Sequence, residues 1–169
     1  MDKITQNYTE QPKTKQELRS FIEAEMEKNG NQCNLNHIDT SLVTDFSWLF
    51  SESLFNGDIP RWDVSGAVDM GFMFERSKFN GDISKWDVSR VAHMDGMFYK
   101  SEFNGDISNW NRISMIGDQD IFLGSAMATE LGVESPCFEQ VKSHCLVKKL
   151  EAALQEASAV QGKVSKARL

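Results

Sequence analysis

A chain of 169 residues with a net charge of −7 has room for one domain and an appendage, and its acidity argues against nucleic acid as a partner. No stretch approaches the roughly 20 apolar residues of a membrane span, and three widely spaced cysteines do not form a disulfide framework. The polar start, Met1 to Glu17, lacks the apolar core of a secretory signal, so we expect a cytoplasmic protein with free thiols.

The first predicted element is an amphipathic helix over residues 15–29. Thr14 and Glu17 have the spacing of a capping box, and Asn29-Gly30 is a typical helix end. Apolar side chains recur between these signals at helical spacing, at Leu18, Phe21, Ile22 and Met26. We predict that this helix covers the exposed end of the repeats that follow it.

A 24-residue tandem repeat occupies residues 31–126. The sequence FNGD begins at Phe55, Phe79 and Phe103; the third unit drifts after Trp110, and a degenerate unit precedes the first. Self-similarity at such a period indicates a repeat architecture, because a single unit cannot bury its apolar face alone. We therefore divide the chain into an N-terminal segment (1–30), the repeats (31–126) and a C-terminal segment (127–169).

Each repeat unit contains two apolar patterns. The segment from Ile59 to Val64 has the L-x-x-L-x-L shape of a leucine-rich repeat and predicts a short strand. Met70, Met73 and Phe74 have helical spacing and predict one helical turn. The predicted fold is α/β: a short leucine-rich-repeat-like solenoid of three clear repeats and one degenerate repeat, with helical caps at both ends and the Trp, Met and Phe columns as its core.

Turns are predicted at two places in each unit. In the joint between units, Gly57 permits a positive φ, and its Asn and Asp neighbours can bond the nearby backbone. Farther along, Asp63 can accept hydrogen bonds from Ser65 in an Asx-type turn. Carboxylates about 4.8 Å apart in successive units repel by about 1 kcal/mol in water. Either such turns or a basic partner or cation must offset this repulsion.

The candidate binding surface is the outer face of the predicted sheet, where every unit contributes side chains to the same columns. The first column is His37, Arg61, Lys85 and Asn109. The second column is Asp39, Asp63, Asp87 and Asn111.

The motif FNGDISKWDVSRVAHMDGMF, which starts at Phe79, resembles the repeat of BspA-like bacterial proteins and of mycoplasma surface lipoproteins. The resemblance covers about residues 31–122. It implies a repeat array on a bacterial cell surface with a role in adhesion and protein binding, in a family often carried on mobile or phage-derived DNA.

The last predicted element is a helix that starts at the Ser-Pro pair of residues 135–136 and runs to about Val160. Three of its residues are placed to pack on the last repeat: Phe138, Val141 and Cys145. Six others have the alternating spacing of a heptad seam: Leu146, Leu150, Ala153, Ala157, Val160 and Val164. Two interpretations stay open: a helix that binds a second copy or a partner, or a cap whose tail frays near Gly162.

Charge and motifs together frame the functional hypotheses. From Pro136 onward six basic and three acidic residues give a charge of +3, which leaves −10 for the rest of the chain. We expect no catalytic residue, metal site or cofactor, because nucleophile, phosphate-loop and dinucleotide motifs are missing.

The leading hypothesis is a protein-interaction module that binds a partner through the outer face of the repeats. One alternative is an acidic inhibitor or decoy, encoded by a phage or mobile element, that occupies a basic site on a host factor. Another is a structural assembly unit that associates through its C-terminal helix.

Overall fold

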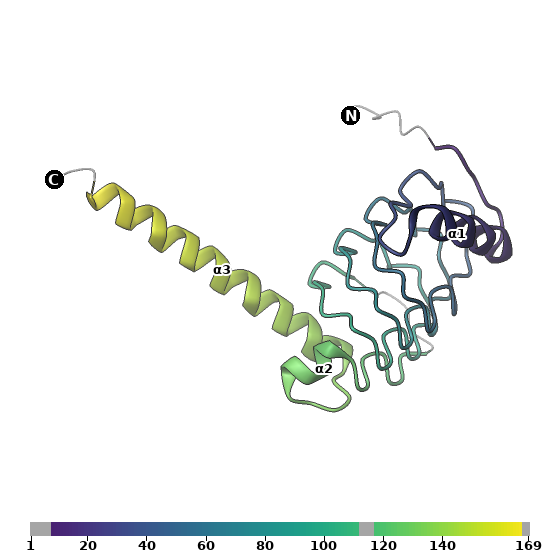
Figure 1. The fold of residues 1–169 in the computed structure, drawn as a ribbon. Coiled ribbons are helices and arrows are strands. Elements are labelled where there is room, and N and C mark those ends of the chain that lie inside the picture. The colour runs from purple at the N-terminus through teal and green to yellow at the C-terminus, as the bar shows by residue number, and fades with distance from the viewer. Residues whose placement is uncertain (1–7, 112–116, 167–169) are drawn as a thin grey trace.

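A computed structural model describes residues 8–111 and 117–166. Figure 1 shows a stack of irregular coils with a helix at each end. The helices are α1 (Lys15–Asn29), α2 (Ala126–Leu131) and α3 (Phe138–Lys166). α1 lies across the first coil, α2 lies at the other end of the stack, and α3 projects from that end (Figure 1).

Helix α1 confirms the first predicted element, including both bounds. The Glu17 backbone N–H donates to Thr14 Oγ1 (3.2 Å), as a capping box requires. The reciprocal bond to the Glu17 carboxylate comes from the Lys13 N–H (2.7 Å) instead of that of Thr14. Two side chains bury the helix against the first coil: Leu18 and Ile22.

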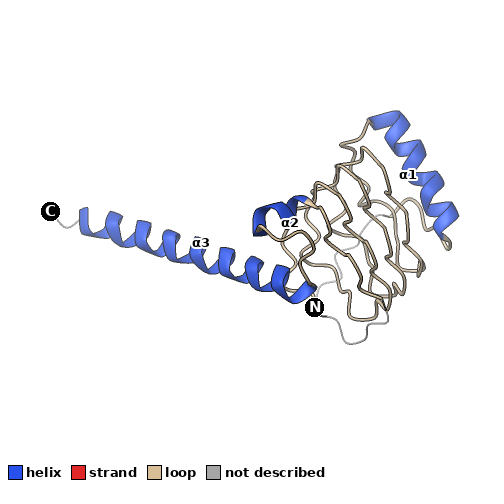
Figure 2. Ribbon diagram, turned by 90° about the horizontal axis from the view of Figure 1, so that it is seen from below, coloured by secondary structure: helices blue, strands red, loops and turns tan. Residues whose placement is uncertain are grey.

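The predicted leucine-rich-repeat solenoid with a repeat sheet is wrong. In the part of the chain that the structure describes, coils are joined by isolated parallel bridges such as Asp45–Asp69, and no strand or sheet forms (Figure 2). The expected strand bends instead, because the Trp62 N–H donates to the Ile59 carbonyl (3.2 Å). Residues three apart would lie on opposite faces of a strand, whereas this turn buries both side chains.

The segment predicted as a helical turn also forms a non-helical turn, in which the Met73 N–H donates to the Met70 carbonyl (3.2 Å). Every second residue of this segment donates a backbone hydrogen bond to the next coil, for example from the Phe74 N–H to the Met97 carbonyl (2.9 Å). Backbone hydrogen bonds are therefore satisfied between coils without either regular structure.

Aromatic columns fill the core, as predicted. Phe74 stacks between Phe50 and Phe98 at centroid distances of 5.4 and 5.7 Å, with ring planes 1° apart. Phe122 ends this column, 5.4 Å from Phe98. The Trp62 indole donates to the carbonyl of Leu35 in the preceding coil (3.0 Å), and the two later core tryptophans repeat this bond. Stacked coils thus bury the apolar side chains that a single unit would leave exposed.

The glycine of each FNGD joint does not have the predicted positive φ. A Cβ at Gly57 would lie 2.0 Å from the Cys33 carbonyl oxygen and 2.8 Å from the Phe55 ring. The equivalent glycines, Gly81 and Gly105, lie under their own Phe rings in the same way. Glycine is needed here because the coils approach closely and the ring packs over the backbone.

The C-terminal end of the stack differs partly from the prediction. The short helix α2 was not predicted; Ser125 caps it, and Gly132, with φ 67°, ends it. Helix α3 begins after the Ser-Pro pair and continues through Gly162 to Lys166, beyond the predicted end near Val160. The predicted packing residues are confirmed as buried: Phe138, Val141 and Cys145.

Candidate binding surface

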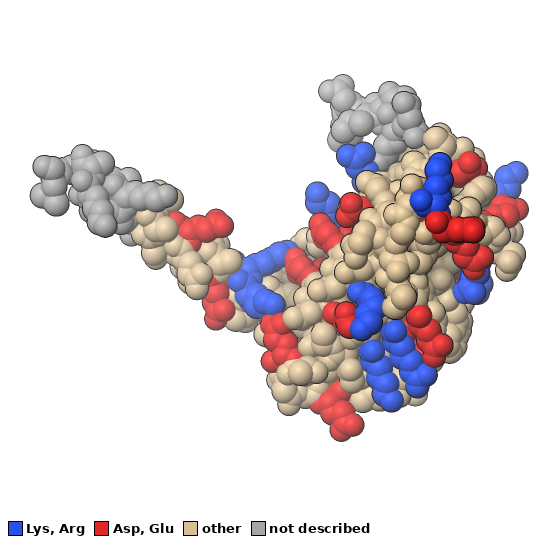
Figure 3. Space-filling view, viewed as in Figure 1, with Lys and Arg blue, Asp and Glu red and all other residues tan. Residues whose placement is uncertain are grey.

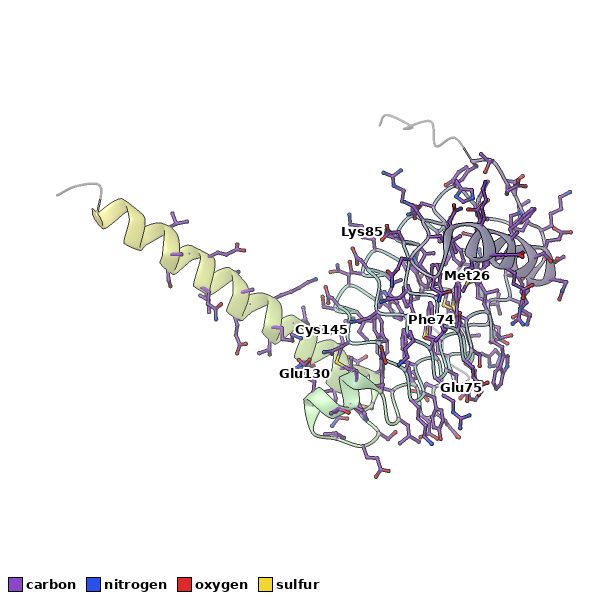
Figure 4. All side chains as sticks on the ribbon, in the orientation of Figure 1. Met26, Phe74, Glu75, Lys85, Glu130 and Cys145 are labelled. Carbon is purple, nitrogen blue, oxygen red and sulfur yellow. The ribbon has the colours of Figure 1, made fainter. Side chains whose placement is uncertain are left out.

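Six of the eight predicted binding residues are exposed on the coils: Arg61, Lys85, Asn109, Asp63, Asp87 and Asn111. We call these six residues the charged edge. Figure 4 shows Lys85 at the rim of the stack, pointing away from the core. Basic and acidic side chains are interspersed over the face visible in Figure 3, so the net acidity of the chain does not make this face uniformly acidic.

The other two predicted residues, His37 and Asp39, are half-buried under the N-terminal part of the chain. The Thr9 N–H donates to the His37 carbonyl (3.1 Å), and the Asp39 N–H donates to the Glu10 carbonyl (2.8 Å). The Gln11 amide also donates to Asp39 Oδ2 (2.7 Å). These two positions therefore anchor the N-terminal segment.

Tyr8 adjoins the acidic column. Burial, together with the nearby Asp39 and Asp63 carboxylates, raises the pKa of its phenol. Sequence reasoning missed this covering segment, because residues 8–11 are polar and show no periodic pattern.

Asx turns fix the acidic column of the charged edge. Asp63 Oδ1 accepts from the Ser65 backbone N–H (3.0 Å) and the Ser65 hydroxyl (2.7 Å), which confirms the predicted bond. The same backbone bond links Ser89 to Asp87 (3.0 Å). Hydrogen bonds from the Ser89 side chain and backbone hold the pKa of Asp87 below its ordinary value. The Asp87 carboxylate therefore stays ionised, and Asx bonds fix the positions of both carboxylates.

One residue of the basic column, Arg61, has its backbone bonded to a side chain of the preceding coil. The Arg61 N–H donates to Asn36 Oδ1 (2.8 Å) in the preceding coil. Asparagines of the FNGD joints form a similar chain, in which Asn80 and Asn104 each donate a backbone N–H to the preceding Asn side chain (2.8 Å). Sequence reasoning treated these asparagines only as local turn residues; their 24-residue spacing is the signal of a bond between coils.

A second polar cluster joins α2, α3 and the last coil (Figure 4). The Glu130 carboxylate accepts from Lys148 Nζ (2.8 Å) and from the Asn104 amide, and it lies 2.7 Å from His144 Nε2. The hydrogen bonds from Lys148, Asn104 and His144 lower its pKa from 4.5 to about 2. Glu130 therefore tethers the C-terminal helices to the stack.

We expect Glu130→Gln to lower stability at pH 7 by about 1 kcal/mol or less, because the cluster is partly exposed. A folded-state pKa below the ordinary value stabilises the fold above about pH 4.5, and this contribution is lost as the pH falls toward 2. Urea unfolding of both proteins at pH 7 and pH 3 measures the difference, which should shrink at the lower pH. Glu134→Gln, an exposed control on the neighbouring loop, should show no such convergence; equal behaviour of the two variants would contradict the tether.

One further surface feature escaped the sequence analysis. The Trp48 ring, 47% exposed, stacks on Phe72 with centroids 4.3 Å apart, and both residues have positive φ. The residues at the equivalent positions of the next two coils, Gly96 and Asp120, also have positive φ. The glycine at position 96 was therefore the one sequence signal of this backbone conformation.

The predicted heptad seam lies on the exposed part of α3. Its side chains are described up to Val160, so that of Val164, the last residue of the predicted seam, lies outside the described residues. No helix in the described ranges combines the length and apolar character needed to cross a membrane.

Comparison with known proteins places the repeats in a family. The family model described as "Mycoplasma protein of unknown function, DUF285" matches residues 17–132, a range that contains most of α1, the described coils and α2. No curated protein and no solved structure matches the chain. The matched family is related to the BspA-like repeat proteins that the FNGD motif resembles, whereas no BspA or leucine-rich-repeat family matches directly. The chain belongs to the DUF285 family.

Proposed function

We propose that the protein is a non-catalytic protein-interaction module that binds a protein partner through the charged edge. The observation that carries the proposal is the exposure of all six residues in equivalent positions of successive coils. Each coil therefore adds one basic or amide side chain and one acidic or amide side chain to a continuous surface. Such additive surfaces are how repeat proteins bind extended partners.

The charged edge is preorganised for binding. Its carboxylates are fixed by Asx bonds, and the Arg61 backbone is bonded to the preceding coil. Trp62 and Trp86, each next to an edge residue in sequence, are buried and bonded to the coil before them. Little backbone freedom is then lost on binding, which favours affinity. Side-by-side columns of opposite charge favour a partner with the complementary alternation.

The test is affinity capture from a lysate of the source cell by the wild-type protein and by Arg61→Glu/Lys85→Glu. We expect a captured protein that the double variant loses by 10-fold or more, because reversed rim charges repel the complementary partner. The control is Lys28→Glu/Lys100→Glu, which changes the net charge equally at exposed sites away from the edge. It should retain the partner.

Two outcomes would contradict the proposal: capture that both double variants retain, or capture that both lose. The first outcome, with steep salt dependence, is what an acidic decoy would give, because both variants add negative charge and its binding to a basic site would depend on net charge and not on the edge. Circular dichroism of each variant establishes that its fold is intact.

A further inference from the structure

Helix α3 leaves the stack after its first two turns. Its buried residues end at Cys145, and every described side chain from Leu146 to Val160 is exposed. Figures 1 and 2 show the rest of the helix as a rod that projects beyond the coils. At 1.5 Å per residue, this exposed stretch is about 20 Å long.

The projecting part of α3 carries an apolar stripe that consists of Leu146, Val147, Leu150, Ala153, Leu154, Ala157 and Val160. The five larger side chains are 50–63% exposed. At about 100° per residue, the seven positions fall within an arc of about 140°. An exposed apolar surface of this kind marks an interaction site.

The protein's own coils do not cover the stripe. Lys148 and Lys149 bond to Glu130 (2.8 Å) and Asp106 (2.7 Å), so the side of α3 that carries them faces the stack. Cys145 is buried on this same side. The centre of the stripe lies about 130° around the helix from Cys145 by helical geometry. The stripe therefore faces away from the stack and is open to another molecule.

We propose that the stripe pairs with the same stripe of a second copy, with the two α3 helices antiparallel about an axis between Leu150 and Ala153. In this register Leu146 lies opposite the partner's Ala157, and Leu150 lies opposite the partner's Ala153. Each large side chain then meets a small one, and the helices can approach closely. A parallel pair would instead set Leu on Leu and Ala on Ala, which leaves gaps at the alanine layers.

Charge and flanking residues favour the same arrangement. On one side of the antiparallel seam, Val147 lies opposite the partner's Leu154, so the apolar contact widens. The antiparallel pair also separates the two bodies, each with a charge of −10, to opposite ends of the helices.

A groove at the base of α3 extends the apolar stripe. It has a volume of about 510 Å³, and its lining includes Leu131, Val133, Ser143 and Val147. The same register brings the partner's Val160 beside Ser143, over this groove. The exposed Val133 side chain would then be covered as well. The groove therefore receives the end of the partner helix in the antiparallel pair.

The pairing is tested first by sedimentation velocity of the full chain from about 1 to about 200 µM. A seam of four helical turns is small, so we expect a dissociation constant on the order of 10 µM. Leu150→Glu should weaken the dimer 10-fold or more. Gln155→Glu adds the same charge on the polar side of α3 and should leave the dimer intact. A chain that stays monomeric throughout, or a dimer indifferent to Leu150→Glu, would overturn the proposal.

The orientation is tested by disulfide trapping in a Cys137→Ser background, since the other two native thiols, Cys33 and Cys145, are buried. A chain with Leu146→Cys mixed with a chain with Ala157→Cys should form a mixed disulfide dimer under mild oxidation. Each chain alone should not cross-link, because like positions are far apart in the antiparallel pair. Self-cross-linking of each chain without the mixed product would mean a parallel pair and would overturn the antiparallel register.

Discussion

Replacing Phe74 by alanine should destabilise the protein by about 3–5 kcal/mol, a large share of the stability of a domain of this size. Phe74 is fully buried and contacts rings above and below it in the stack, as well as Phe79 at 4.3 Å. Alanine leaves a cavity that these fixed rings cannot fill. Urea unfolding followed by tryptophan fluorescence measures the loss, because Trp86 lies 6.4 Å from Phe74.

The matched control for this prediction is Phe72→Ala, two residues away in the same coil. Phe72 lies half-exposed at the surface and stacks on Trp48. Its truncation should cost about 1 kcal/mol or less, because the site opens to solvent and leaves no enclosed cavity. Equal losses for the two variants would mean that the column through Phe74 is not the core of the stack.

Replacing Gly57 by alanine should be comparably severe, by several kcal/mol, although it adds only one methyl group. The added carbon would overlap the Cys33 carbonyl of the preceding coil at 2.0 Å, so the two coils must separate. That separation would also strain the bond from the Asp58 N–H to the same carbonyl (3.2 Å). Thermal unfolding by circular dichroism provides the measurement.

Gly66→Ala is the control for the close approach at Gly57. Its added Cβ would lie 3.6 Å from the nearest atom, the Ser41 carbonyl oxygen, and its φ is not in the left-handed region. We expect a change near zero or a slight gain, because alanine restricts the unfolded chain. A strong loss at Gly66 with tolerance at Gly57 would contradict the packing account of the FNGD joint.

The sequence was sufficient to predict α1, the repeat period and the buried columns, because each depends on local signals or on which side chains are apolar. Thr14 and Gly30 fix the helix bounds, and the columns of Phe and Trp recur every 24 residues. The burial of these columns follows from the apolar character of their side chains, whichever backbone conformation the coils adopt.

The turns that replace the expected strand and helical turn could not be predicted, because an apolar spacing does not specify the backbone conformation between the apolar residues. The L-x-x-L-x-L shape is compatible with a strand, yet Ile59 and Trp62 are both buried through a turn. Asx bonds at Asp63 and its copies compete further with a regular ladder. Positive φ at Trp48 and Phe72 has no sequence signal in those residues themselves.

The candidate site was predictable in part. The 24-residue columns identified six positions that the structure exposes. The prediction of an exposed binding surface failed at His37 and Asp39, because the 24-residue columns do not show which segment covers the first coil. The heptad seam in α3 was visible in the sequence, but only the position of Lys148 and Lys149 against the stack shows that the seam faces outward.

The most direct test of the charged edge is site-specific photo-cross-linking in a lysate of the source cell. A photoreactive phenylalanine would replace Asn109 on the edge in one protein and Gln16 on α1 in another; both residues are exposed and uncharged. Binding through the edge predicts a discrete cross-linked product from position 109 that is missing from position 16. A product from position 16 alone, or from neither, would contradict a binding role for the charged edge.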